Sequence, residues 1–491
     1  MLRLDQGWLR WSHQLNFLQH VEHLMDDEHR EVYAQTLDVF LSKLKTVTDI
    51  LGRLVEHQVT SSAGDESRLS SKRVRYALKK NSLDKAIEEL ETWQRTADHS
   101  WFLLMKIASP RLDAAMESDR EAMAATIPSA FAIRAGLQDE GVSNAPHRGI
   151  TFNPDELSKM AITQIPFSEL RIGQRTDNGS SYVLNAINLP QVLKYHIAKK
   201  DTRNLVRKLQ HNEPQTFGLL SCKGFVVHQT QSGDEPEAAF TMILRTPPFS
   251  TKPRSLRDIL LNAPSPASLS VRFELARELA KAASYVHSFG FVHKNIRPET
   301  ILTFEDTRTG KPTSYLAGFE NFRHEDGCTR RKGDDAFGKN LYRHPNRQGT
   351  NPRNDYVMQH DIYSLGVCLL EVGLWRSFVQ YCPVSDQGLP SPFLGLPAEV
   401  TSAGQAVTFC MMAGKEHLVS LARSQLLQCM GSRYAEVVVT CLTCLDPGNV
   451  DFGDAGEFED EDGVRVGARY IEKVRMSRPG VNNFVSAYGW L

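Results

Sequence analysis

Hydrophobic positions in the first third of the chain recur at helical spacing and form two apolar stripes. One stripe lies within residues 37–54, and the other lies within residues 83–97 and continues over 101–107. Residues three or four apart share one helix face, so each stripe predicts a helix that must bury this face against another helix. We therefore expect an antiparallel helical bundle over residues 1–113. The stripes comprise Leu37, Phe40, Leu41, Leu44, Val47, Leu51 and Leu54, and Leu83, Ile87, Leu90, Trp93 and Ala97.

The pattern changes after this bundle. Residues 114–155 are rich in Ala, Gly, Ser and Pro without a clear period, which predicts a linker. Beyond it lie runs of strand composition and helical runs, which indicate a mixed domain. The resemblance given below implies that this domain covers residues 156–480. The fold class expected for the whole chain is α+β, with an all-α bundle first. Strands are predicted over 182–187, 218–228 and 238–244, and helices over 191–210, 275–288 and 434–445.

Residues 293–300 carry the most specific motif, His-Lys-Asn-Ile-Arg-Pro-Glu-Thr. It resembles the catalytic loop of protein kinases, His-Arg-Asp-Leu-x-Pro-x-Asn. The resemblance places Asn295 where kinases carry the catalytic base and Thr300 where they carry a magnesium-binding Asn. An amide cannot act as a general base, and a neutral hydroxyl is a poor magnesium ligand. The motif therefore implies a two-lobed kinase-like fold without its usual reaction.

Three later segments extend this resemblance in the order and spacing of kinases. Residues 316–320 replace the Asp-Phe-Gly motif, residues 342–346 resemble the end of an activation segment, and residues 360–366 resemble the start of the central helix. Positions that pack or turn the chain in kinases are retained, whereas positions that perform chemistry are lost. The retained positions are His293, Pro298, Phe319, Pro345, Asp361 and Gly366, and the degenerate catalytic and metal positions are Asn295, Thr300 and Gly318.

The expected smaller lobe, about residues 165–246, departs further from the kinase pattern. Its only candidate glycines, Gly173 and Gly179, are too far apart for a phosphate-binding loop, and a turn at 177–179 is the simpler interpretation. The strand at 182–187 has no Lys. The next helix has no Glu to pair with one. The expected larger lobe covers about residues 247–480, after a connection at Thr246-Pro247-Pro248.

These losses predict that the chain does not transfer phosphoryl groups. No metal and no cofactor is expected, while weak ATP binding stays open. Glu299, Glu320 and Asp326 are the nearest carboxylates that could substitute, and we interpret each as solvated surface charge. The kinase resemblance also implies that Asp361 accepts hydrogen bonds from the backbone of the catalytic loop.

Composition narrows the class of protein. A length of 491 residues predicts two or three domains, and 41% hydrophobic with 23% charged residues is typical of globular proteins. A net charge of −1 argues against nucleic-acid binding. No apolar run is long enough for a membrane span, and residues 1–5 lack the apolar core of a signal peptide, so we expect neither. Cys441 and Cys444 are interpreted as buried helix cysteines rather than a redox or zinc pair, which predicts a reducing, cytoplasmic setting.

The whole architecture is similar to fungal proteins that join a HeLo-type (prion-inhibition and propagation) domain to a degenerate kinase domain. The resemblance rests on the bundle with the run Val-Arg-Tyr-Ala-Leu at 74–78, and on His-Lys-Asn and Gly-Phe-Glu in the kinase-like half. Such domains usually open with a glycine-rich apolar helix. This chain lacks one, so we expect a truncated bundle. The resemblance implies fungal self/non-self recognition or regulated cell death, carried out with protein partners.

Two other functions stay open at this point. The chain could be an atypical active kinase that binds ATP, or a scaffold that self-associates through its bundle. The basic run at 329–332, beside the hydroxyl of Thr329, is interpreted as solvated loop charge, with a docking patch for an acidic or phosphorylated partner as the alternative.

Overall fold

A computed structural model describes the second part of the chain and a few residues of the first third. Cα positions divide the chain into two units, Met1–Ala135 and Gly136–Leu491, which are described separately. The described residues are 38, 41–42, 44–50, 82, 150–187, 195–210, 214–228, 239–263, 265–320, 322–324, 333–382, 387–449 and 452.

In the first unit, residues 44–50 form a helix in which Val47 is buried, while Leu41 of the same predicted stripe is 58% exposed. The second stripe, the rest of the bundle and most of the linker lie outside the described residues. Asp326 and the basic run at 329–332 lie outside them too. The bundle therefore stays a prediction.

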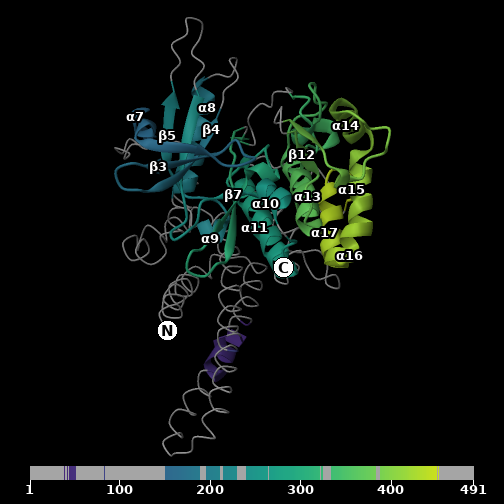
Figure 1. The fold of residues 1–491 in the computed structure, drawn as a ribbon, viewed down its shortest axis with the longest axis horizontal. Helices are drawn as coiled ribbons and strands as arrows, with labels where there is room; N and C mark the ends of the chain where they lie inside the picture. Colours follow the sequence, from purple (N-terminus) through teal and green to yellow (C-terminus); the bar gives the residue numbers. More distant parts are fainter. Residues whose placement is uncertain are drawn as a thin grey trace, which may run out of the picture. The chain divides into compact units, whose positions relative to one another are not determined.

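The second unit contains a six-stranded sheet with the order β1-β5-β6-β4-β3-β2 (Figure 1). All neighbours pair antiparallel except β1 and β5, which are parallel. The first strand falls inside the range predicted as linker, so the sheet begins earlier than expected. The strands are β1 (Thr151–Phe152), β2 (Met160–Gln164), β3 (Arg171–Arg175), β4 (Ser181–Ile187), β5 (Cys222–His228) and β6 (Ala239–Arg245).

Short helices and turns complete this sheet region. The tight turn predicted at 177–179 joins β3 to β4, with Gly179 at a φ of 68° and its N–H donating to the Arg175 carbonyl. One long helix, α8 (Tyr195–Gln210), packs against β5. Its buried positions recur at helical spacing, which explains why this face meets the sheet. They are Ala198, Thr202, Leu205, Val206 and Leu209. The short helices are α7 (Asp155–Ser158) and α9 (Pro214–Phe217).

The helical region is built around α13 (Met358–Leu374), in which every residue is buried. It contacts α11 (Leu269–Ser288) and α17 (Ser432–Leu442). A Cβ on Gly366 would lie 2.8 Å from the Cβ of Cys441, so only glycine allows α13 to approach α17 this closely. The α11 helix begins six residues before its predicted start because the Ser268 hydroxyl caps it, accepting from the Val271 N–H.

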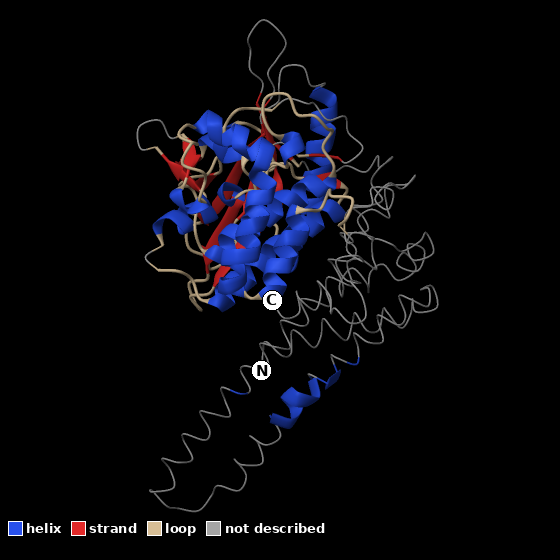
Figure 2. Ribbon diagram, turned by 90° about the vertical axis from the view of Figure 1, so that its right-hand side faces the viewer, coloured by secondary structure: helices blue, strands red, loops and turns tan. Residues whose placement is uncertain are grey.

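Smaller elements surround these helices (Figure 2). Three short sheets occur among the described residues: β10-β9-β7, β11-β8 and β12-β13. Their strands are β7 (Arg254–Ser255), β8 (Phe291–Val292), β9 (Ile301–Glu305), β10 (Pro312–Leu316), β11 (Arg323–His324), β12 (Val379–Tyr381) and β13 (Gly388–Pro390). The remaining helices are α10 (Leu256–Asn262), α12 (Phe337–Asn340), α14 (Ala403–Phe409), α15 (Lys415–Leu421) and α16 (Leu427–Met430), with π-helical turns at Cys410–Gly414 and Ala422–Leu426 and 3-10 turns at Pro298–Thr300, Pro345–Arg347 and Pro392–Leu394.

The described region is thus a mixed α+β structure, as the sequence predicted at that level. Cys441 and Cys444 are both buried and carry free thiols. Within the described part of the chain, no helix combines the length and the apolar character needed to span a membrane.

Candidate functional site

The loop of residues 293–300 connects β8 to β9 and lies against the segment that follows β10. The N–H of Ala317 donates to the Thr300 carbonyl at 2.9 Å, and His293 Nε2 hydrogen-bonds the Ala317 carbonyl at 3.0 Å. The motif residues of both segments are therefore brought together in space. Pro298 opens the 3-10 turn Pro298–Thr300, where its missing N–H leaves no hydrogen bond unmade.

Asp361 anchors the first half of this loop. Its carboxylate, which is fully buried in α13, accepts the N–H of His293 at 2.7 Å and the N–H of Lys294 at 2.8 Å. The Tyr356 hydroxyl donates to it at 2.6 Å, and His287 Nε2 lies 3.0 Å away. Burial by itself would raise the pKa of Asp361, but the hydrogen bond and the charge of His287, with the other partners, lower it to about 2. These are the backbone bonds that the kinase resemblance implies for this Asp.

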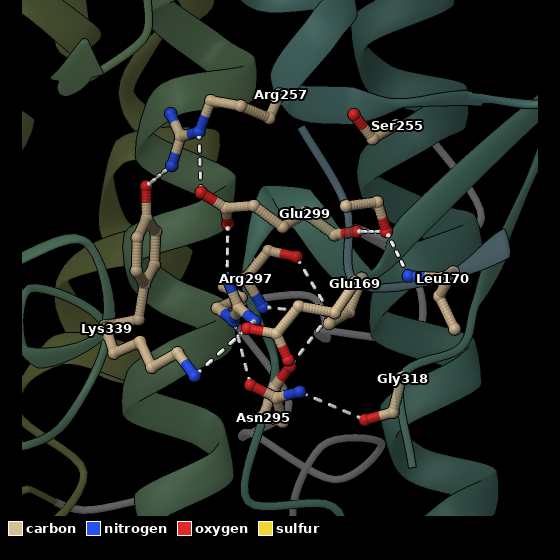
Figure 3. A network of polar contacts seen from close by, with 12 residues as sticks. Glu169, Leu170, Ser255, Arg257, Asn295, Arg297, Glu299, Gly318 and Lys339 are labelled. Atoms are coloured by element: carbon tan, nitrogen blue, oxygen red, sulfur yellow. Dashed lines mark hydrogen bonds and ion pairs between the residues drawn. The ribbon is translucent and has the colours of Figure 1, made fainter. Parts of the chain in front are cut away.

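Asn295 uses both ends of its amide within the protein. Its Nδ2 donates to the Gly318 carbonyl at 3.1 Å, and its Oδ1 accepts the Nε–H of Arg297 at 2.8 Å (Figure 3). The side chain is buried. A group held in this way positions the loop and offers no basic lone pair to a substrate.

Thr300 and Gly318 fill the remaining space at the centre of the loop. The Thr300 hydroxyl bonds the carbonyls of Asn295 and Arg297 at 2.8 and 2.9 Å. A Cβ on Gly318 would lie 2.4 Å from Thr300 Cγ2, and Gly318 has a φ of 80°. The backbone and the neighbouring methyl group both disfavour any side chain here. The magnesium that the kinase resemblance implies therefore does not fit these residues, and none of them has a free ligand atom of the right kind.

Asn185 joins the sheet to this centre, although the sequence analysis did not single it out. Its Oδ1 accepts the N–H of Phe319 at 2.7 Å, and its side chain is completely buried in β4. The Phe319 ring packs against His293 with ring centroids 4.8 Å apart. A lone amide in the middle of an otherwise apolar strand was the available signal, because such a group needs a partner when buried.

Glu299 is not the solvated surface charge that the sequence suggested. It is 2% exposed, and its Oε1 accepts from Arg257 Nε at 2.9 Å and from the Tyr381 hydroxyl at 2.6 Å. Arg257 is itself fully buried and also pairs with Glu371 at 2.8 Å. Burial tends to raise the pKa of Glu299, but Arg257 and Arg297 hold it below its usual value. The prediction failed because the partner, Arg257, lies 42 residues away in sequence.

A six-residue loop, residues 165–170 between β2 and β3, contacts the 293–300 loop. The Ser168 hydroxyl donates to the Glu299 carbonyl at 2.6 Å, and the Ser255 hydroxyl donates to the Pro166 carbonyl at 2.6 Å. Ile165 and Leu170, the first and last residues of the loop, are buried. This loop contains no glycine and ties the sheet region to the helical region.

Glu169, at the tip of this loop, faces two cations. Its Oε1 lies 3.1 Å from Arg297 Nη2 and 3.0 Å from Lys339 Nζ (Figure 3). It also shares a hydrogen bond with the carboxyl of Glu320, which lowers the pKa of Glu169 to about 2, assisted by the two cations. Burial and Glu169 raise the pKa of Glu320 to about 8. Glu320 is also partly buried, so it is not the solvated charge that we expected.

A groove lies between the inner face of β2, β3 and β4 and the segment after β6. Its volume is about 620 Å³, within the range of small-molecule sites. Residues 245–253 line one wall, and three of them, Pro247, Pro248 and Pro253, have no backbone N–H to donate. The opposite wall carries Ile172 and Gln174. The expected connection between lobes thus borders this groove.

The other scaffold positions lie away from this centre. Pro345 is the first residue of a 3-10 turn, and the preceding His344 caps it by accepting the Asn346 N–H at 3.2 Å. Gly366 lies at the α13–α17 crossing. The chain matches no protein-family model, and no curated protein matches it significantly. Its function must therefore be argued from this geometry.

Proposed function

We propose that the chain is a catalytically degenerate, protein kinase-like signalling or interaction protein. The observation that carries this proposal is the closed centre at Asn295, Thr300 and Gly318. Each of these positions is engaged with another of them, so the place for a base and two metal ligands is filled by protein contacts. A positioned base contributes roughly 10²- to 10⁴-fold to a rate, and metal ligation adds to this.

A kinase-like fold with a smaller and a larger lobe is supported by the order of the elements. Five antiparallel strands, β2 to β6, include a long helix between β4 and β5, and a mainly helical region follows. The Asp361 carboxylate bonded to the amides of His293 and Lys294 is further support, since the motif resemblance alone implied those bonds. The proposal also includes four expectations that rest on the sequence alone. They are the fungal HeLo-type architecture, protein partners, a cytoplasmic setting and self-association through the first third of the chain.

Weak ATP binding is the second candidate property, and the groove beside residues 245–253 favours it. The pair Pro247-Pro248 in its wall has no backbone N–H to donate to an adenine ring. We therefore expect any nucleotide to bind weakly and without a need for magnesium.

The proposal is tested by thermal shift with ATP, with and without magnesium, and by transfer of radiolabelled phosphate from ATP. We expect no magnesium-dependent shift and no transfer to the protein itself or to a generic substrate. The variant Asn295→Asp with Gly318→Asp should stay inactive, because Thr300 still blocks position 318. Transfer that depends on Glu320 would contradict the proposal and favour an atypical active kinase.

A further inference from the structure

The carboxylate of Glu169 is bound as a ligand would be bound. Two cations from separate elements, Arg297 in the 293–300 loop and Lys339 in α12, converge on the same oxygen, Oε1, at 3.1 and 3.0 Å. The carboxyl of Glu320 forms a further hydrogen bond to it. Arg and Lys side chains placed in this way are the usual means by which proteins hold carboxylate and phosphate groups.

Arg297 is prepared for this role before any anion arrives. Its side chain is 7% exposed, and its Nε–H is fixed on Asn295 Oδ1 at 2.8 Å. The Nη2 atom lies 3.1 Å from Glu169 Oε1 as an ion pair, and it makes no hydrogen bond in the described structure. A guanidinium held rigidly in this way loses little entropy when it binds an oxyanion.

We propose that Arg297 and Lys339 form a binding site for a small oxyanion, a phosphate or a carboxylate group, which Glu169 fills from within the chain. The side chain of Glu169 is 48% exposed, so solvent reaches the site from the outer side. An incoming anion competes with Glu169 for the same donors. Because Glu169 is tethered to them, it competes at a high effective concentration.

Displacement of Glu169 has a structural consequence for the loop of residues 165–170. Glu169 provides the charged contacts of this loop, and the hydroxyls of Ser168 and Ser255 provide neutral ones. Ligand binding that replaces Glu169 should therefore loosen the loop over the 293–300 loop, because a ligand shifts the protein toward the conformation that binds it.

The test is a titration with inorganic phosphate at pH 6.5, followed by calorimetry. We expect Glu169→Ala to bind phosphate at least tenfold more tightly than the wild type, because the tethered competitor is gone. Glu156→Ala is the matched control. Glu156 also bridges one Lys and one Arg, at 2.6 and 2.8 Å, and its Arg175 has a second carboxylate in Asp177, as Arg297 has in Glu299. Its two cations are not those of the proposed site. This control should leave phosphate affinity unchanged.

A second variant locates the binding. In the Glu169→Ala background, Lys339→Gln should weaken phosphate binding at least fivefold. Acetate in place of phosphate distinguishes a carboxylate-selective from a phosphate-selective site. Equal phosphate affinity of the wild type and Glu169→Ala, or no effect of Lys339→Gln, would overturn the proposal.

Hydrogen exchange keeps the proposal testable should Glu169→Ala fail to fold. In the wild-type protein, high phosphate concentrations should increase amide exchange in residues 165–170, and Lys339→Gln should reduce this increase. Exchange in this loop that does not respond to phosphate in the wild type would contradict the coupling between site and loop.

Discussion

The two halves of the 293–300 loop differ in how polar groups are used. In the first half, the buried carboxylate of Asp361 satisfies the amides of His293 and Lys294 and thereby holds the backbone in place. In the second half, the Asn295 side chain donates to the Gly318 carbonyl, and the Thr300 hydroxyl donates to the Asn295 carbonyl. A side chain at position 318 would collide with Thr300. The comparison teaches that a loop can keep its backbone anchor while the positions at its centre are occupied by contacts within the protein.

The largest expected effect comes from removing the anchor. Asp361→Ala leaves two buried amides and the Tyr356 hydroxyl without this acceptor, and a lost buried partner costs about 1–3 kcal/mol per group. We expect the free energy of unfolding to fall by about 3–5 kcal/mol, measured by urea denaturation.

The exposed Asp335 provides the control for this variant. Asp335→Ala should change stability by less than about 0.5 kcal/mol. Small and equal effects of the two substitutions would show that Asp361 does not anchor the 293–300 loop. They would also count against the kinase-like fold.

The next effect concerns the closed centre. Gly318→Ala places a methyl group 2.4 Å from Thr300 Cγ2 at a φ of 80°, so we expect a loss of about 2–3 kcal/mol. Thr300→Ser removes Cγ2 but keeps the hydroxyl that bonds Asn295 and Arg297. In this background the loss should be smaller by about 0.5–1 kcal/mol, because the nearest contact is removed while the contact with Cβ of residue 300, at 2.7 Å, and the left-handed backbone remain.

A double-mutant cycle by denaturant unfolding measures this difference. Additive effects of Gly318→Ala and Thr300→Ser would show that Cγ2 of Thr300 does not obstruct a side chain at position 318.

The smallest expected effect is a dependence of the free energy of unfolding on pH, which arises from the contact between Glu169 and Glu320. The pKa of Glu320 is raised to about 8 from 4.5, so the stability contributed by its protonated form is lost as the pH rises from about 4.5 to 8. The pKa of Glu169 is lowered to about 2, so its contribution is lost only as the pH falls below about 4.5. We expect a decrease of about 1–2 kcal/mol between pH 5 and 8, smaller than the full shift implies because the pair is partly exposed.

Glu320→Gln keeps a hydrogen-bond donor toward Glu169 but does not titrate. Thermal unfolding of this variant should therefore show a flatter profile over the same pH range than the wild type. A wild-type profile that rises with pH in this range would contradict the proton shared between the two carboxyls.

Much of the fold could be predicted because it depends on local pattern. The strand at β4 and the turn at 177–179 follow from a run of strand composition and from an Asn-Gly pair, and α17 follows from its apolar run. The start of α11 was missed because it depends on a capping hydroxyl, Ser268, and not on apolar spacing.

The candidate site divides in the same way. The sequence by itself determined which groups are present: an amide at 295, a hydroxyl at 300 and no side chain at 318, since chemical capacity belongs to the residue type. Only the tertiary structure decided that Glu299 is buried on Arg257 and that Glu169 and Glu320 share a proton beside Arg297. These contacts join residues far apart in sequence, and burial and charge there depend on which segments the fold brings together.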